Sequence, residues 1–195
     1  MQDKKAALYD CAMALFTEKG FKDTSVSDIT QRAGFAVGTF YNYYASKDAL
    51  FAEILKRETA VLMKDIMAEL DINGEPKELI RHMLALNTER MMAHPILRQW
   101  YDPEMFVHIE RAFRSADELS AVDFLYRDFK ALVERWQDEG RMRSDISSGM
   151  IMAMFGAIIR IGHHKEEIGI AYFPELQDRL SEFVLQGLSQ KPNQE

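Results

Sequence analysis

The spacing of apolar residues is helical along almost the whole chain. In the first helical stretch the apolar side chains recur every three or four positions: Leu8, Cys11, Ala12, Leu15 and Phe16. That period places them on one face of a helix. No stretch alternates convincingly between apolar and polar residues with the period of two that a half-buried strand requires. The pattern therefore predicts an all-α fold of nine to ten helices.

Capping and turn residues set the expected ends of these helices. Ser25 and Ser46 are favourable N-caps, and Asp28, three residues after Ser25, comes close to completing a capping box. Gly20 and Gly34 each follow a helical stretch, where a left-handed conformation suits a residue without Cβ. We expect helices over residues 4–19, 26–33, 37–44, 47–70, 76–94, 103–114, 116–139, 145–164 and 174–188, with a short segment at 96–101.

The helix predicted from residue 47 is unusually long. About 25 residues at 1.5 Å each span roughly 37 Å, which exceeds the width of a small domain. This helix must therefore lead from an N-terminal module into the rest of the chain. We expect two domains, residues 1–50 and residues 51–195.

The segment around Gly34 holds two short helices joined by a tight turn. This is the arrangement of a helix-turn-helix, whose second helix enters the major groove of DNA. Phe40 and Tyr44 share one face of that second helix, so Tyr41 and Tyr43 must point elsewhere. Hydroxyl and amide side chains exposed there suit phosphate oxygens and base edges. The spacing alone leaves an ordinary aromatic core open as the alternative.

Short motifs at fixed spacing run through the same segment. They read Thr-Ser-Val-x-Asp-Ile from Thr24, Ala-Gly at the turn, Gly-Thr-Phe-Tyr from Gly38 and Ser-Lys-Asp-x-Leu-Phe from Ser46. With these motifs, residues 5–55 closely resemble the DNA-binding domain of the TetR/AcrR family of transcriptional regulators. The chain departs from the family pattern at Ala36, where a capping residue such as serine is usual.

The resemblance implies which residues contact DNA. Phosphate contacts are expected from Ser25, Thr39, Tyr41 and Lys47. Base-edge or groove contacts are expected from Ser27, Val37, Gly38, Asn42 and Tyr43. The resemblance also implies that the C-terminal helices bind an effector and form a homodimer.

Methionine is concentrated where the effector pocket is expected. Ten of the 12 methionines follow residue 50, and their flexible, polarisable side chains suit adaptable apolar surfaces. Ordinary core packing is the alternative for each of these residues. The predicted pocket residues are Met67, Met83, Asn87, Arg90, Met91, Trp100, Phe106, Phe113, Phe129 and Met154. We expect a small apolar or aromatic effector and no cofactor.

Small residues recur four positions apart in the helix before the last, and the last helix carries an apolar stripe. Pairing both helices with their symmetry mates would form a four-helix, two-fold interface. Packing within one chain is the alternative. The predicted interface residues are Gly149, Ala153, Gly156, Ala157, Leu176, Leu180, Phe183, Val184 and Leu188.

The net charge of −7, taken over the whole chain, argues against a nucleic-acid binder. The distribution of charge changes that interpretation. Residues 1–50 carry six basic and six acidic side chains, whereas residues 51–195 carry 18 and 25. A neutral N-terminal domain would bind DNA through hydroxyls, helix N-termini and dimerisation more than through cations, so binding should respond weakly to salt.

Other features favour a soluble, cytoplasmic protein that is neither an enzyme nor bound to a membrane. The longest apolar run is stopped by Arg160 after residues 149–159, and a membrane span needs about 20 residues. The single cysteine, Cys11, lies on the core stripe of the first helix. His163 and His164 leave a haem or metal site open, although adjacent residues of a helix do not share a face.

These observations predict a ligand-responsive, DNA-binding repressor that its effector releases from a roughly palindromic operator. Three alternatives remain: a haem or metal sensor on the same scaffold, a small helical enzyme, and a partner-binding module that no longer binds DNA.

Overall fold

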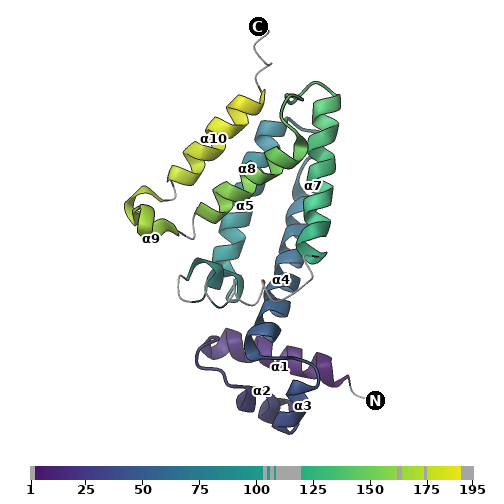
Figure 1. The fold of residues 1–195 in the computed structure, drawn as a ribbon, viewed down its shortest axis with the longest axis vertical. Helices are drawn as coiled ribbons and strands as arrows, with labels where there is room; N and C mark the ends of the chain where they lie inside the picture. The colour runs from purple at the N-terminus through teal and green to yellow at the C-terminus, as the bar shows by residue number, and fades with distance from the viewer. Residues whose placement is uncertain are drawn as a thin grey trace. The chain divides into compact units, whose positions relative to one another are not determined.

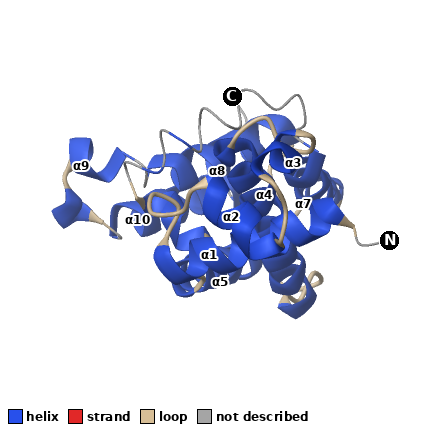
Figure 2. Cartoon of the chain, turned by 90° about the horizontal axis from the view of Figure 1, so that it is seen from below, coloured by secondary structure: helices blue, strands red, loops and turns tan. Residues whose placement is uncertain are grey.

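The computed structural model describes residues 3–102, 105, 108, 120–161, 164–173 and 175–189 (Figure 1). These residues form helices and connecting turns and contain no β-strand, as the colouring of Figure 2 shows. The predicted all-α fold is therefore confirmed, with a number of helices close to the predicted nine to ten.

The observed helices begin and end close to the predicted residues. They are α1 (Lys4–Lys19), α2 (Val26–Ala33), α3 (Val37–Tyr41), α4 (Lys47–Glu69), α5 (Pro76–Ala93), the 3-10 helix η1 (Leu97–Tyr101), α7 (Ser120–Asp138), α8 (Ser148–Ile161), α9 (Lys165–Ile168), the 3-10 helix η3 (Ile170–Tyr172) and α10 (Glu175–Ser189). The helix predicted over 103–114 lies outside the described residues, apart from Met105 and His108, which are helical. The prediction did not include the two short elements α9 and η3.

Local capping explains several of these ends. The Asp3 side chain accepts hydrogen bonds from the amides of Lys5 and Ala6 at the start of α1. Ser46 Oγ accepts from the amide of Ala49 at 3.0 Å and so begins α4, as predicted. Gly20 has a φ of 85°, a conformation that residues with a Cβ rarely adopt, and it ends α1.

The chain divides into two compact units. The first comprises Met1–Val61 and Met91–Ala121, and the second comprises Leu62–Arg90 and Val122–Glu195. Helices α4 and α5 therefore supply residues to both units. The predicted domain boundary after residue 50 is a division by function, and it stays a prediction.

The first unit has a core built on aromatic side chains. The rings of Phe16, Phe21 and Phe51 meet with centroid distances of 5.5, 5.3 and 4.7 Å. Such pairs stabilise a fold by roughly 0.5–1.5 kcal/mol beyond the area they bury. Ile29 of α2 and Phe40 of α3 are also fully buried. The helix-turn-helix (residues 25–44) is therefore anchored by its own apolar side chains.

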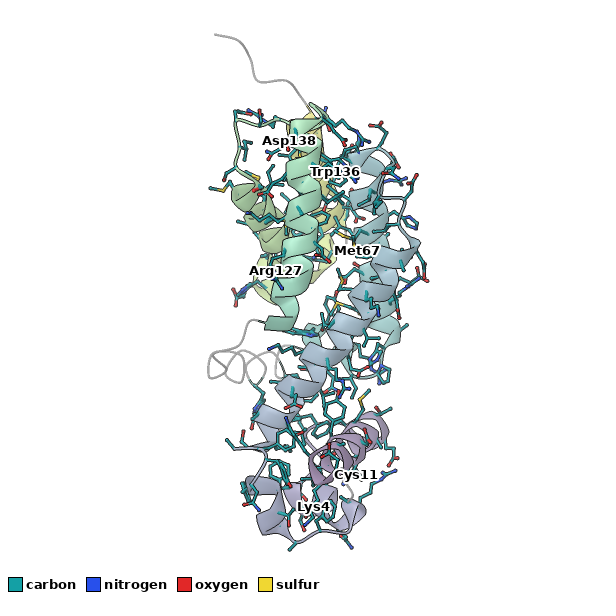
Figure 3. The ribbon with its side chains drawn as sticks, turned by 90° about the vertical axis from the view of Figure 1, so that its right-hand side faces the viewer. Lys4, Cys11, Met67, Arg127, Trp136 and Asp138 are labelled. Atoms are coloured by element: carbon teal, nitrogen blue, oxygen red, sulfur yellow. The ribbon has the colours of Figure 1, made fainter. Side chains whose placement is uncertain are left out.

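The core of the second unit gathers residues from α4, α5, α7, α8 and α10. Trp136, whose side chain is labelled on α7 in Figure 3, is fully buried and meets Phe129 edge-on with ring centroids 6.3 Å apart. The buried members of this cluster are Ile66, Leu70, Leu79, Ile80, Met83, Phe129, Leu132, Val133, Trp136, Met142, Ile151, Phe155, Ile158, Leu185 and Leu188.

Two arginines of the second unit hold the turn between α4 and α5. Arg135 donates a hydrogen bond to the carbonyl of Ile72, and Arg141 donates to the carbonyl of Gly74. Because the turn contacts α7 and the residues after it in this way, the C-terminal end of α4 is fixed within the second unit.

Candidate nucleic-acid interface

The turn between α2 and α3 has the geometry expected of a helix-turn-helix. Gly34 lies in the left-handed region, with φ 75° and ψ 28°, and its amide bonds to the carbonyls of Thr30 and Gln31. The amide of Phe35 also bonds to the Thr30 carbonyl, at 2.8 Å. These bonds satisfy the last carbonyls of α2 and redirect the chain into α3.

Helix α3 is shorter than predicted, since it ends at Tyr41 rather than at residue 44. The amides of Tyr43 and Tyr44 both bond to the carbonyl of Phe40 at 3.0 Å, so the chain closes into a turn there. At the other end, Ala36 offers no side-chain hydrogen bond to the helix. The missing cap anticipated from the sequence is therefore confirmed.

The helix-turn-helix sorts its aromatic residues between interior and surface. Phe40 and Tyr44 are buried, whereas Val37, Tyr41 and Tyr43 are 44%, 57% and 42% exposed. These are three of the ten large apolar side chains exposed in the described part of the chain, and they lie within seven consecutive positions. Gly38 and Asn42 are exposed beside them, and Thr39 is half-buried. The predicted contact residues of α3 and of the turn after it are thus accessible, Thr39 only in part.

Ser25 and Ser27 are exposed at the start of α2. Ser25 completes the predicted capping box: its Oγ accepts from the amide of Asp28 at 3.1 Å, and its own amide donates to Asp28 Oδ2 at 2.8 Å. That amide and Lys19 lower the pKa of the Asp28 carboxyl to about 2.

Lys47, at the start of α4, is held inside the first unit. Its Nζ donates hydrogen bonds to the carbonyls of Phe21 and Thr24, at 2.7 Å each, and lies 4.1 Å from the centroid of the Phe21 ring. Burial lowers the pKa of Lys47. The sequence predicted a phosphate contact for this side chain, whereas in the structure its ammonium group is already a donor within the chain.

Several other cations of residues 1–50 are paired with carboxylates. The pairs are Arg32–Glu18 (2.6 Å), Lys19–Asp28 (2.9 Å) and Lys5–Glu53 (3.0 Å). Exposed pairs of this kind stabilise a fold little. They nevertheless reduce the positive charge that this part of the chain presents to a duplex.

Polar contacts that the sequence did not predict join distant parts of the first unit. Tyr9 Oη lies 3.5 Å from one carboxylate oxygen of Glu58, and His94 Nε2 lies 3.3 Å from the other. His94 Nδ1 accepts from the amides of Ile96 and Leu97, so Nε2 carries the hydrogen that faces Glu58. Burial, with the Glu58 charge, raises the pKa of Tyr9 to about 12.

A second contact of this kind involves His108. Its Nδ1 lies 3.0 Å from Asp48 Oδ1, and its ring is 5.6 Å from that of Phe21. These partners are 60 or more residues apart in the sequence, and no local pattern predicts them.

The predicted effector-pocket residues are distributed between core and surface. Met83 and Phe129 are buried in the core of the second unit, and Met67 packs against it. Arg90 is paired with Glu69 at 2.5 Å. Asn87, Met91, Trp100 and Met154 are half-buried, and Phe106 and Phe113 lie outside the described residues. These side chains divide between core and surface among the described residues, and the pocket stays a prediction.

The predicted dimer residues also separate into two groups. Leu188 is buried in the core of its own chain, and Leu180 and Val184 pack against that core. Ala153, Ala157 and Phe183 are exposed, Phe183 by 64%. Gly149, Gly156 and Leu176 are half-buried. Leu188 therefore makes its apolar contacts within its own chain and is not exposed to a second copy.

Neither a metal centre nor a membrane helix is found in the part of the chain that the structure describes. That part contains no group of three side chains placed to hold a metal ion. His163 lies outside it, and His164 is exposed with Glu167 at 3.3 Å. Among the same residues, no helix combines the length and apolar character needed to cross a bilayer.

Comparison with known proteins identifies the N-terminal part of the chain. Residues 8–54 match the family model described as bacterial regulatory proteins, tetR family. The uncharacterized HTH-type transcriptional regulator YdgC of Bacillus subtilis is 33% identical over 89 residues, which cover 44% of this chain and 45% of that protein. The HTH-type transcriptional repressor KstR2 of Mycobacterium tuberculosis is 27% identical over 94 residues, or 48% of this chain and 47% of KstR2.

The first of the curated relatives, YuxN of Bacillus subtilis, is covered over only 32% of its length, so these matches span a third to a half of the relatives. The fold comparison reaches further along the chain. The TetR-family transcriptional repressor FadR of Thermus thermophilus, solved in complex with lauroyl-CoA, has a TM-score of 0.69 and covers 98% of both chains at 21% identity. Residues 8–54 are therefore similar to the tetR family of bacterial regulatory proteins, and the chain shares its fold with a solved repressor of that family.

Proposed function

We propose that this chain is a DNA-binding transcriptional repressor whose affinity for its operator is controlled by a small apolar effector. The observation that carries the proposal is the surface of residues 37–43, where Val37, Tyr41 and Tyr43 are exposed while Phe40 and Tyr44 anchor the segment. Large apolar side chains grouped on a fixed element mark a binding surface. The match of residues 8–54 to the tetR family model supports duplex DNA as the partner.

The residue types on this surface divide between the two tasks of a DNA reader. Hydroxyl groups suit phosphate oxygens, and the proposed phosphate contacts are Ser25, Thr39 and Tyr41. The amide of Asn42 suits a base edge, and apolar contacts suit a thymine methyl group. The proposed groove contacts are Ser27, Val37, Gly38, Asn42 and Tyr43.

A binding assay with matched variants tests the DNA-binding surface. The probe is a fluorescent duplex taken from the region upstream of the chain's own coding sequence, and anisotropy reports the dissociation constant. Asn42→Ala should weaken binding by about 1–3 kcal/mol per subunit if it reads a base, and Tyr41→Ala should also weaken it. Tyr172→Ala is the control, because Tyr172 is 65% exposed on η3. Equal losses for Tyr41 and Tyr172, or no binding by the unaltered chain, would refute the proposal.

We further infer that the chain acts as a homodimer through α8 and α10. A two-fold dimer presents two recognition helices, which must reach successive major grooves about 34–36 Å apart. The exposed Ala153, Ala157 and Phe183 support this interface, since small residues allow close approach and Phe183 is otherwise left in water.

The effector would act by favouring a dimer geometry that no longer matches this spacing. A ligand shifts such an equilibrium only by its difference in affinity for the two geometries. FadR of Thermus thermophilus binds an acyl-CoA, so acyl-CoAs of several chain lengths belong in the first panel of test ligands. The expected result is release of the duplex as ligand is added. A ligand that raises the melting temperature without changing DNA affinity would contradict this mechanism.

A further inference from the structure

Lys47 lies at the start of α4, and its ammonium group is bonded to two backbone carbonyls of the same unit. It donates to the carbonyls of Phe21 and Thr24 at 2.7 Å and lies 4.1 Å from the centre of the Phe21 ring. An ammonium group has three N–H donors. Two are used by these carbonyls, and the ring shields one side of the group.

The loop that Lys47 holds is the one that sets the start of α2. Thr24 is 1% exposed, and its Oγ1 donates back to the carbonyl of Gly20 at 2.8 Å, which closes the loop on itself. The residue after Thr24 is Ser25, the N-cap of α2. Any displacement of the Thr24 carbonyl therefore moves the first turn of α2, where Ser25 and Ser27 are exposed.

The electrostatic surroundings of Lys47 also oppose a role as a phosphate clamp. Asp23, Asp28 and Asp48 all act on its charge, and each favours the protonated amine. They offset only part of the effect of burial, which lowers the pKa of Lys47 overall. A DNA phosphate brought to the same place would have to compete with two carbonyls and these three carboxylates.

On the basis of the proposed DNA-binding function, we propose that Lys47 is a positioning residue of the DNA reader and not a phosphate contact. It fixes the loop of residues 20–25 against the first turn of α4, and so sets the position of Ser25 and Ser27 on the duplex. Its loss would weaken operator binding by misplacing other contacts, without removing a cation from the DNA surface.

The salt dependence of binding separates these two roles. A lysine that neutralises a phosphate contributes about 0.9 to the slope of log K against log salt, and two such lysines in a dimer contribute about twice that. Lys47→Met keeps the apolar stem beside Phe21 and removes all three donors. Positioning predicts at least tenfold weaker binding at every salt concentration with an unchanged slope.

The experiment measures operator affinity between about 50 and 300 mM salt. Affinity that depends on phosphate contacts falls steeply over this range. Lys47→Arg, which keeps the charge and donors, should recover part of the affinity. Lys64→Met, on an exposed position of the same helix, is the control and should change neither affinity nor slope. Hydrogen exchange at the amides of residues 24–29 should quicken in Lys47→Met and not in Lys64→Met.

Two outcomes would overturn the proposal. One is a slope reduced by about twice 0.9 with unchanged hydrogen exchange, which would identify a direct phosphate contact. The other is operator binding by Lys47→Met that equals that of the unaltered chain. Failure of the unaltered chain to bind any duplex would instead refute the proposed function, and it would be seen before any variant is compared.

Discussion

Gly38 offers a substitution that should strengthen the fold and weaken DNA binding at the same time. It lies in α3, its φ is not in the positive range, and a Cβ built on it meets no atom within 4 Å. Alanine at such a position reduces the freedom of the unfolded chain and stabilises a protein by about 0.4–1 kcal/mol. The free protein therefore has no structural need for glycine here.

The need arises if the backbone at Gly38 closely approaches the duplex, as we propose. A Cβ would then hold the backbone away from the base edges in the groove, and losing one such contact costs about 1–3 kcal/mol. Since 1.4 kcal/mol is about tenfold in affinity, Gly38→Ala should weaken operator binding by tenfold or more per subunit.

Two measurements on one variant test this reasoning. Urea unfolding followed by circular dichroism should show a higher midpoint for Gly38→Ala, and anisotropy should show weaker operator binding. Gly187→Ala in α10 is the matched control for stability, because its Cβ also meets nothing within 4 Å, and its urea midpoint should rise as well. A Gly38→Ala chain that binds the operator as tightly as the unaltered chain would refute the close approach, and a destabilised one would refute the conformational argument.

Three other predictions follow from the geometry. The pKa of Asp28 is about 2 in the folded chain against an ordinary 3.8. The stability that this carboxylate provides is therefore present above about pH 4 and is lost as the pH falls toward 2. The urea midpoints of Asp28→Asn and of the unaltered chain should converge over that range. Phe183→Lys should raise the dimer dissociation constant at least tenfold, since burying such a side chain is worth about 1.5–3 kcal/mol, whereas Tyr172→Lys should not; light scattering after gel filtration decides. Raising salt from 50 to 200 mM should weaken operator binding less than the roughly thousandfold expected for six phosphate contacts, and a larger loss would show that the cations contact DNA.

Much of the N-terminal fold could be predicted because its determinants are local. The capping box of Ser25 and Asp28, the Ser46 cap and the left-handed Gly34 each involve residues within a few positions of one another. The end of α3 was the exception. No glycine or proline stands in the four residues directly after Tyr41. The chain turns there because the amides of Tyr43 and Tyr44 share the carbonyl of Phe40.

The roles that the sequence could not supply depend on partners far along the chain. Lys47 was predicted to face DNA because of its position after the recognition helix, but its partners are backbone carbonyls 23 and 26 residues earlier. Backbone carbonyls carry no residue-type signal. Leu188 shows the same limit for the dimer: an apolar stripe on one helix cannot distinguish its own core from that of a second copy, and the structure buries this residue within one chain.

If the chain binds DNA as proposed, the internal pairing of Arg32 with Glu18 and of Lys19 with Asp28 affects how it would find its site. Attraction to arbitrary DNA is almost wholly electrostatic, and it supports sliding along the genome. A DNA-binding domain whose cations are paired with carboxylates of its own chain should bind non-specific DNA more weakly. More of such a protein would stay free in solution, and its occupancy of the operator would closely follow its own concentration and that of its effector.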